Sequence, residues 1–378
     1  MTTATMTKQQ ISIHRETLDE ALHSVAGAAA AKSIRPIIQN VLLRVDEAGN
    51  ASLYATDLEA SVWRSVGAIE GGMGIGIAMV LNPQRLGAIL ATTPDESLCF
   101  EAEDDRVTIR GKACSFTLAS EDPALFPVQG DDAADSSMRL DAAELRRALR
   151  RTSYALDVES ARYALNGVIL ERDGPDWVLV ATDGRRLSRQ VIRPEIIGDE
   201  APFLVRPIIP SKTLKLLERT LDEGTVEFST TGTTCRFDLG ETRIWSRLAE
   251  GRFPRWQDAM PRSHATRVPM KADELRNAVQ QAAILVSRES RAVDFAVDAD
   301  RLRLSTESAD VGASRVEMPI ASEGPDQRFA LDPGYVVDAL KSLEGGEVRL
   351  EILDDQNPIV IRTDDGFTGV FMPITREK

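Results

Sequence analysis

Three acidic residues recur at matching places along the chain and could support acid–base or metal chemistry. Asp57 and Asp183 each follow Ala-Thr, and Glu307 follows Ser-Thr in the corresponding place of a later segment. Carboxylates serve as general acids, general bases and metal ligands. A catalytic residue is needed once per chain, however, whereas a turn that ends a strand is needed in every copy of a repeated fold. Because Asp after Thr also favours turns, we expect structural turns at these positions.

Other motifs of catalysis or ligand binding are missing. The chain has no P-loop, no dinucleotide-binding glycine motif after a strand and no G-x-S-x-G nucleophile motif. The glycine-rich stretch 71–76 is not followed by Lys-Ser or Lys-Thr, so we expect a flexible connection there. Cys99, Cys114 and Cys235 form no C-x-x-C pair, and none of the three histidines lies near a cysteine at metal-ligand spacing. We therefore expect no catalytic residue, no metal and no cofactor.

Composition narrows the class of protein further. The 378 residues suggest two or three domains, and the net charge of −14 excludes a protein that holds nucleic acid or membrane by bulk positive charge. The apolar runs are too short to span a bilayer, and the polar start MTTATMTKQQ has no signal-peptide core. We expect a cytoplasmic protein without a membrane partner, a frayed tail before Ile11, and Met1 or Met6 as the start.

Two ordered blocks of sequence recur three times. The first block is a pair of alternating apolar segments around a tight turn, and it ends at Thr56, Thr182 and Thr306, so the period is 126 and then 124 residues. The second block begins 27 or 28 residues later, at Pro83, Pro210 and Pro333. Two blocks in the same order at three places indicate a triplicated domain, because a period near 125 is a domain rather than a solenoid repeat.

Each repeat is predicted to contain the same elements. Apolar residues at helical spacing predict a first helix around 18–25, 145–152 and 275–282. A strand pair, a helix opened by the proline and two closing strands follow, such as 97–101 and 106–110. We therefore predict an α+β fold of three similar domains, 8–130, 138–262 and 264–378, each with two amphipathic helices packed on antiparallel sheets.

Four sequence strings carry a resemblance to a known family. They are Arg162–Gly167 (RYALNG), Val180–Leu187 (VATDGRRL), Arg247–Pro254 (RLAEGRFP) and Gly369–Ile374 (GVFMPI). In this order, within a triplicated chain of this length, they make nearly the whole sequence similar to the bacterial β sliding clamps, the processivity subunits of replicative DNA polymerases.

The resemblance implies a DNA sliding clamp, a head-to-tail homodimer whose six domains close into a ring around duplex DNA. Enclosure makes tight phosphate contact unnecessary, so an acidic chain can work on DNA. The implied partners are double-stranded DNA of any sequence, the replicative polymerase subunit, the clamp loader complex, and other polymerases and repair proteins with clamp-binding motifs. A clamp confers processivity, acts at the nucleoid in the cytoplasm and catalyses nothing.

The resemblance also implies DNA-contacting residues. These are Lys32, Arg146, Arg147, Arg150, Arg162 and Tyr163. The arginines from 146 to 151 are expected to form a basic strip opposite Leu145 and Leu149. A helix surface that only faces solvent would have the same sequence pattern and is the alternative. Ala164 stands where the family usually has a tyrosine, which weakens the assignment of its loop.

A groove for partner peptides is implied between the second and third domains. Matched position by position, it comprises Leu165, Thr182, Gly184, Arg186, Leu187, Pro254, Pro358, Val370, Met372, Pro373 and Ile374. Removing apolar side chains of a partner from water against such a lining contributes favourable binding free energy, and unbranched Met372 can adapt to several ligands. Core packing is the alternative for Leu165, Leu187 and Val370. Arg185 and Asp258 depart from common family residues, so the peptide preference can differ.

The dimer interface is implied at Phe116, Ile284 and Leu285, with Arg110 as a possible charge at the same seam. The apolar residues could equally be buried within their own domains. A repeat-built interaction scaffold that never meets DNA also remains open. Loading onto circular DNA would distinguish these alternatives.

Overall fold

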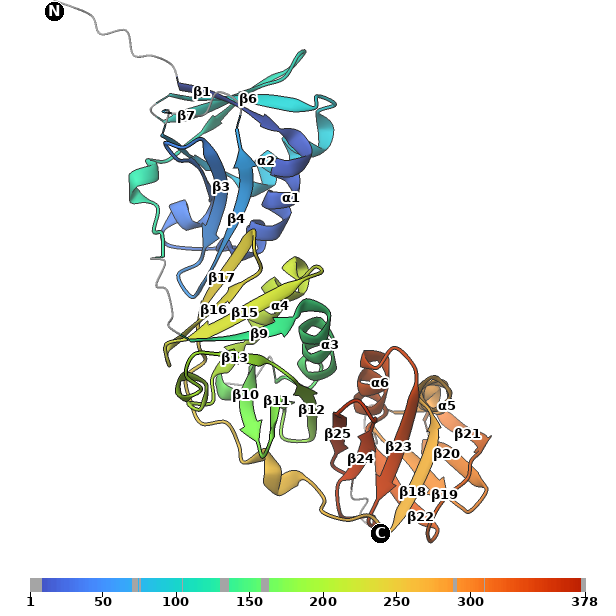
Figure 1. The fold of residues 1–378 in the computed structure, drawn as a ribbon. Coiled ribbons are helices and arrows are strands. Elements are labelled where there is room, and N and C mark those ends of the chain that lie inside the picture. The colour runs from blue at the N-terminus through green and yellow to red at the C-terminus, as the bar shows by residue number, and fades with distance from the viewer. Residues whose placement is uncertain are drawn as a thin grey trace, which may run out of the picture. The chain divides into compact units, whose positions relative to one another are not determined.

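The computed structural model describes residues 9–69, 74, 76–103, 105–129, 136–157, 163–287, 291–308 and 310–374 (Figure 1). By its internal contacts the chain divides into two units. Unit one comprises 1–142, 195–202 and 212–247, and unit two comprises 143–194, 203–211 and 248–378.

The same order of elements occurs three times along the chain, except that the second repeat has one additional strand, β13. The first repeat contains β1 (Gln9–His14), α1 (Arg15–Val25), β2 (Val41–Val45), β3 (Asn50–Thr56), β4 (Ala60–Ala68), β5 (Ile77–Leu81), α2 (Pro83–Thr92), β6 (Ser97–Glu103), β7 (Arg106–Arg110) and β8 (Ser115–Ala119). The second contains β9 (Ser137–Asp141), α3 (Ala142–Ser153), β10 (Gly167–Asp173), β11 (Asp176–Thr182), β12 (Arg186–Ile192), β13 (Glu195–Ile197), β14 (Ile208–Pro210), α4 (Ser211–Thr220), β15 (Thr225–Thr230), β16 (Thr234–Asp238) and β17 (Thr242–Arg247). The third contains β18 (Thr266–Lys271), α5 (Ala272–Ala282), β19 (Val293–Val297), β20 (Arg301–Ser308), β21 (Gly312–Pro319), β22 (Gln327–Leu331), α6 (Pro333–Ser342), β23 (Glu347–Ile352), β24 (Ile359–Arg362) and β25 (Phe367–Phe371).

Unit one is built on two antiparallel sheets. Their strand orders are β1-β6-β7-β8 and β13-β9-β15-β16-β17-β4-β3-β2-β5. Helix α1 packs on α2, β3 and β4 and buries Leu18, Leu22 and Val25 against them (Figure 1). These residues recur every three or four positions, so one face of the helix is apolar and supplies the core.

Unit two repeats this construction. Its strand orders are β14-β10-β11-β12-β25-β24-β23-β18 and β21-β20-β19-β22. Helices α5 and α6 lie side by side (Figure 1), and their buried faces join one core with the inward residues of both sheets. Leu275 and Leu340, one from each helix, are fully buried in that core.

One pairing rule joins consecutive repeats. Strand β4 of the first repeat pairs with β17 of the second, and β12 of the second pairs with β25 of the third. Three consecutive antiparallel strands follow the first helix of each repeat, for example β2, β3 and β4. In both cases the last of these three strands pairs with the last strand of the next repeat. The last strand of the first repeat, β8, has no earlier repeat to pair with, and β21 of the third repeat has no later one. Within the described chain each of these two strands ends its sheet.

The predicted fold is confirmed, and three local predictions are corrected. Each repeat closes with three strands, because β8, β17 and β25 follow the two expected strands. Pro210 ends β14, where it pairs with Gly167, and the helix begins at Ser211. Gln9 and Gln10 belong to β1, because they pair with β6, and are not part of a frayed tail. Most of the glycine-rich stretch 71–76 lies outside the described residues.

The two Thr-Asp dipeptides form turns, as predicted, but the prediction is wrong for Glu307, which lies inside β20 and pairs with Ala313 of β21. In the first repeat Thr56 Oγ1 donates to the Ala60 carbonyl at 3.0 Å, and Asp57 Oδ1 accepts from the Ala60 amide at 2.9 Å. Thr182 and Asp183 make the corresponding bonds in the second repeat. The turn needs a left-handed residue after the aspartate, which Gly184 supplies with φ 89° and Leu58 with a more strained φ of 77°.

Candidate functional site

A pocket of about 200 Å³ lies in unit two where β12 pairs with β25. Its lining includes seven of the predicted groove residues, Thr182, Gly184, Arg186, Leu187, Pro254, Val370 and Met372. Sequence reasoning did not place Arg185, Arg255, Trp256 and Ala259 in the lining, although they complete it. We call this pocket the β12–β25 groove.

The floor of the groove belongs to a core cluster. Leu187 pairs directly with Val370 across the two strands, and their side chains are 4% and 2% exposed. Phe253 and Trp256 lie in the same cluster. Met372, by contrast, is 44% exposed. The groove therefore combines a rigid floor, which also serves as core packing, with an adaptable methionine at its surface.

Arg186 joins the wall of the groove to the turn between β11 and β12 and to helix α6. Its Nε bonds Asp183 Oδ2 at 3.0 Å, and a terminal nitrogen bonds Asp338 Oδ2 of α6 at 2.9 Å. The guanidinium also lies over the rings of Tyr335 and Tyr154, at 4.5 and 5.5 Å from their centroids. Burial raises the pKa of Tyr154, so this ring stays a neutral phenol beside the cation.

Replacing Arg186 by lysine is expected to loosen this wall. A lysine keeps the charge but cannot hold both carboxylates in the planar fork geometry, and a loss of about 1–2 kcal/mol follows. We expect a lower apparent Tm and weaker binding of groove peptides, measured by calorimetry and fluorescence titration. Arg193→Lys, at an exposed position of unit two that does not line the groove, is the matched control and should change neither. Full stability of Arg186→Lys would contradict the assignment.

The segment after Pro254 is anchored by the carboxylate of Glu171, whose side chain is 12% exposed. Trp256 Nε1 donates to Glu171 Oε2 at 2.9 Å, and Gln257 and Arg206 bond the same carboxylate at 3.2 and 3.0 Å. Trp256 is only 3% exposed and yet lines the groove. A large aromatic residue just after Phe-Pro in a joining segment was the sequence signal that could have placed it there.

The rim of the groove is cationic. Arg185 and Arg255 line it and are exposed, and no carboxylate belongs to its described lining. Asp258 is exposed on the adjacent short helix (Trp256–Ala259) but does not line the groove. A ligand with negative charge beside its apolar side chains is therefore favoured.

Four predicted groove residues do not line this pocket. They are Leu165, Pro358, Pro373 and Ile374. Leu165 is buried and its carbonyl accepts from the Asp157 amide at 3.0 Å, while the Ile374 amide donates to the Ala330 carbonyl at 2.8 Å. Their assignment to the partner-peptide groove stays a prediction.

The predicted basic strip on α3 is only partly present. Arg147 is exposed, and Arg146 and Arg150 are half-buried. Arg150 donates to the Ser342 carbonyl at 3.3 Å and pairs with Glu344. Lys32 is exposed on the segment before a short helix (Pro36–Gln39). Arg162 and the Tyr163 side chain lie outside the described residues.

Arg151 does not belong to the strip. It is 6% exposed and bonds Asp365 Oδ2 at 2.8 Å and Gln190 Oε1 at 3.0 Å. Three positions after buried Ala148 it lies on the inner face of the helix. Burial acts to raise the pKa of Asp365, but hydrogen bonds from Thr363 and Arg151 outweigh this and the pKa lies below its ordinary value. Arg151 is therefore an internal ion-pair partner.

The predicted seam residues lie on or near edge strands β8 and β21. Phe116 is half-buried on edge strand β8. Ile284 is 74% exposed and Leu285 is half-buried in a 3₁₀ helix (Ala283–Leu285) after α5, not in α5 itself, and this helix contacts edge strand β21. Arg110 is bonded to nearly buried Glu101 at 2.8 Å within its own sheet.

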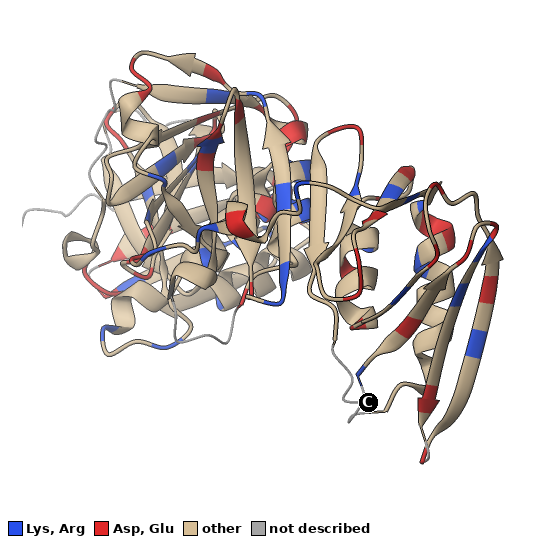
Figure 2. Ribbon diagram, turned by 90° about the horizontal axis from the view of Figure 1, so that it is seen from below, with Lys and Arg blue, Asp and Glu red and all other residues tan. Residues whose placement is uncertain are grey.

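Charged residues of both signs are mixed along the chain (Figure 2), and the described residues hold no cluster of metal ligands. Figure 2 shows Lys and Arg interspersed with Asp and Glu along strands and helices. In the described part of the chain, no three His, Cys, Asp or Glu side chains gather as metal ligands would. Burial raises the pKa of the Cys235 thiol, so it stays protonated. Within the same residues, none of the helices has the length and apolar composition of a membrane span.

Comparisons with known proteins agree along the whole chain. Models of the DNA polymerase III beta subunit match residues 9–129 (N-terminal domain), 139–255 (central domain) and 257–375 (C-terminal domain). The beta sliding clamp of Caulobacter vibrioides is 27% identical over 97% of this chain and 99% of that protein. That of Escherichia coli K12 is 26% identical over 93% of this chain and 95% of that protein.

Solved structures of sliding clamps also match this chain in fold. A sliding clamp from Pseudomonas aeruginosa, bound to griselimycin, is 25% identical and superposes with a TM-score of 0.89 over 98% of this chain and all of that one. The sliding clamp of Bacillus subtilis, 22% identical, shares the fold with a TM-score of 0.89. The three consecutive domain matches leave one conclusion: this chain belongs to the DNA polymerase III β-subunit family, the non-catalytic sliding clamps.

Proposed function

We propose that the chain forms a ring-shaped homodimer that encloses duplex DNA and tethers the replicative polymerase, the clamp loader and other clamp-binding proteins through the β12–β25 groove. The observation that carries this proposal is the pairing rule between repeats. Strands β4 and β12 each pair with the last strand of the next repeat, whereas β21 of the third repeat and β8 of the first end their sheets.

Continuing the same rule to a second copy pairs β21 with β8 of the next subunit. Such a contact is heterologous, and two copies related head to tail close when the rotations sum to a full turn. Strand β21 has no buried residue along its length, and Ile284 beside it is exposed. An edge strand of this kind presents backbone N–H and C=O groups that can pair with a strand of another chain. Pairing of β21 with β8 of a second copy would satisfy these groups on both strands.

The register of the new pairing follows from the existing ones. Across the two internal junctions Val62 faces Ile244 and Ser188 faces Gly369. The ladders within each repeat make Phe116 the equivalent of Ile244 and Gly369. They make Arg315 the equivalent of Val62 and Ser188. We therefore place Phe116 opposite Arg315 of the partner subunit.

The groove supports the tethering part of the proposal. Its floor is apolar and fixed, so a partner peptide that inserts an apolar side chain gains about 25 cal/mol per Å² removed from water. The related Pseudomonas aeruginosa clamp is described as bound to griselimycin, which is in keeping with a ligand site in this family.

The enclosure of DNA is tested by loading onto a closed circle. The protein, the clamp loader and ATP are incubated with nicked circular DNA, which is then linearised. A ring is retained on the circle and slides off the cut ends. Retention that survives linearisation would show direct binding instead, and no retention on the circle would contradict the proposal.

Arg147 is the described arginine of α3 best placed to test DNA contact without disturbing the fold. Because it is exposed, Arg147→Glu should leave the apparent Tm unchanged while it lowers loading about threefold or more by reversing one charge near phosphate. Arg150→Glu is less informative, since it would bring two carboxylates together at Glu344. Exposed Arg262→Glu is the control. Normal loading by the Arg147 variant would make that arginine a simple surface residue.

A further inference from the structure

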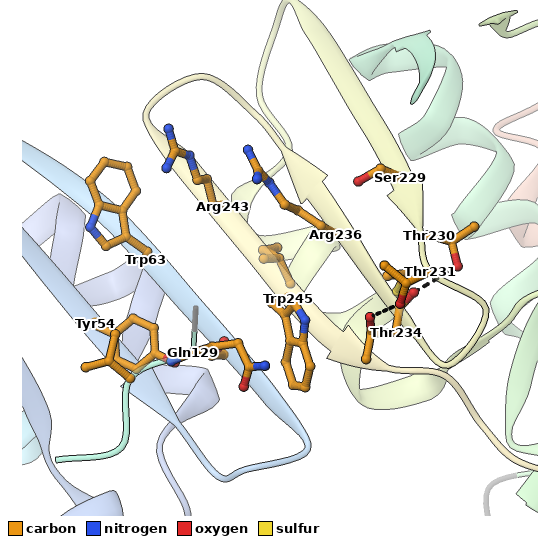
Figure 3. Close-up of a pocket in the computed structure, with 14 residues that line it drawn as sticks. Tyr54, Trp63, Gln129, Ser229, Thr230, Thr231, Thr234, Arg236, Arg243 and Trp245 are labelled. Carbon is orange, nitrogen blue, oxygen red and sulfur yellow. Dashed lines mark hydrogen bonds between the residues drawn. The ribbon is translucent and has the colours of Figure 1, made fainter. Parts of the chain in front are cut away.

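A second pocket, of about 220 Å³, lies in unit one where β4 pairs with β17 (Figure 3). We propose that this β4–β17 pocket is a second docking site, which takes an extended segment of a partner protein with an aromatic side chain next to a carboxylate. This inference rests on the proposed function, because it assumes that the β12–β25 groove binds peptides and treats the β4–β17 pocket as the equivalent site in unit one.

The strand pairs that form the two pockets are equivalent in register. In the groove Leu187 faces Val370, and in the second pocket Ser61 faces Trp245. Within their repeats Thr182 faces Leu187 and Thr56 faces Ser61, so the two pairs occupy the same place in the repeated fold. Each pair lines its own pocket.

The joining segments are equivalent as well. Phe126-Pro127-Val128-Gln129 follows the first repeat, and Phe253-Pro254-Arg255-Trp256 follows the second. Both phenylalanines are buried, and the residues after each proline line the adjacent pocket. Val128 is 54% exposed at its pocket, as Met372 is 44% exposed at the groove. The β4–β17 and β12–β25 pairings thus have equivalent strands and joining segments, and each carries a pocket of nearly the same volume.

The chemistry of the β4–β17 pocket differs from that of the groove, and this difference selects the ligand. Tyr54, Trp63 and Trp245 supply three aromatic rings. Figure 3 shows Trp63 beside the two arginines of the pocket, and Gln129 between Tyr54 and Trp245. The backbone N–H of Gln129 donates to the Tyr54 hydroxyl at 2.9 Å, which anchors the joining segment at the pocket. Stacking and edge contacts with such rings favour an aromatic guest.

Charge selects a carboxylate beside that aromatic side chain. Arg236 and Arg243 line the pocket, while no carboxylate does among its described residues. Asp238 outside the lining is shared by both arginines, at 2.9 Å from Arg236 and 3.2 Å from Arg243. The described lining of the pocket therefore carries two guanidinium groups and no carboxylate. The Arg243 guanidinium also lies 5.0 Å from the Trp63 ring centroid, which orients it for a planar anionic partner.

Fluorine NMR of the full chain can test both sites at once. The chain has four tryptophans. Trp63 and Trp245 line the β4–β17 pocket, Trp256 lines the groove, and buried Trp177 packs against Phe203 and lines neither. Labelling with 5-fluorotryptophan gives four resonances, assigned by single Trp→Phe variants. The probe is the peptide acetyl-Gly-Asp-Phe-Asp-Gly-amide, compared with versions that carry Asn for both Asp or Ala for Phe.

We expect the acidic aromatic probe to shift the Trp63 and Trp245 resonances saturably, with Trp177 unchanged. The Asn and Ala versions should each bind about fivefold more weakly or worse, because each removes one of the two recognition elements. Arg236→Gln combined with Arg243→Gln should weaken the probe by a similar factor or more. Arg64→Gln is the matched control, since Arg64 is on β4 but bonds Thr242 and Glu241 outside the pocket.

Two results would overturn the inference. The Trp63 and Trp245 resonances could stay unchanged, whether or not Trp256 shifts, and a shift of Trp256 alone would leave the proposed groove function standing. The Asn version could also bind as tightly as the acidic probe, which would remove the charge recognition. A shift of Trp63 and Trp245 without Trp256 would support this pocket and show that the groove does not take this probe.

Discussion

The variant Phe116→Arg is expected to be a monomer at concentrations where the unaltered protein is a dimer. At the proposed seam this residue faces Arg315 of the partner subunit, so the substitution removes aromatic burial and places like charges opposite each other. Each seam should lose about 2–3 kcal/mol. Because a two-subunit ring contains the seam twice, the dimer dissociation constant should rise by a factor of about 10³ or more.

Sedimentation at micromolar concentration measures this directly. Phe116→Leu is the control and should remain dimeric, because it keeps an apolar side chain at the seam. Phe116 is half-buried on an edge strand, so an unchanged circular dichroism spectrum should accompany the monomeric mass. A dimer of unaltered stability would remove Phe116, and the register that places it, from the interface.

Met372→Asp is expected to abolish peptide binding at the β12–β25 groove while the protein stays folded. Met372 is 44% exposed, so the free protein tolerates a carboxylate there. A bound peptide would desolvate that carboxylate without supplying a partner, and the affinity for the polymerase tail peptide should fall about 100-fold. Fluorescence anisotropy with a labelled tail peptide measures the change.

Leu187→Asp would not separate binding from folding. Leu187 is 4% exposed within the core beneath the groove, so a carboxylate there would be buried without a partner and would destabilise the fold. The matched control for Met372 is Leu204→Asp, because Leu204 is also an exposed apolar residue of unit two and does not line the groove. Full peptide affinity in Met372→Asp would contradict the groove assignment.

The joining segments show where sequence reasoning missed part of the site. Both segments lie among turn residues, so local patterns predict loops there and say nothing of the pockets beside them. Trp256 lines the groove because Glu171, 85 residues earlier, accepts its indole hydrogen. Such a partner cannot be found by spacing along the chain. The groove residues implied by the resemblance were placed better, since seven of them line one pocket.

Arg151 illustrates the same limit within a helix. Helical spacing correctly predicts the amphipathic α3, because the period of apolar residues is a local property. It does not say that Asp365, more than two hundred residues later, lies where it can pair with Arg151. The strip of arginines was therefore predicted one residue too long.

The sequence by itself determined the triplication, the helices and the Thr-Asp turns, because repeats, apolar periodicity and turn hydrogen bonds involve residues close together along the chain. Only the tertiary structure decided which strands join consecutive repeats, that β8 and β21 end their sheets, and that each internal junction carries a pocket. These features depend on backbone pairing between distant strands, and every strand of suitable pattern offers the same backbone donors and acceptors.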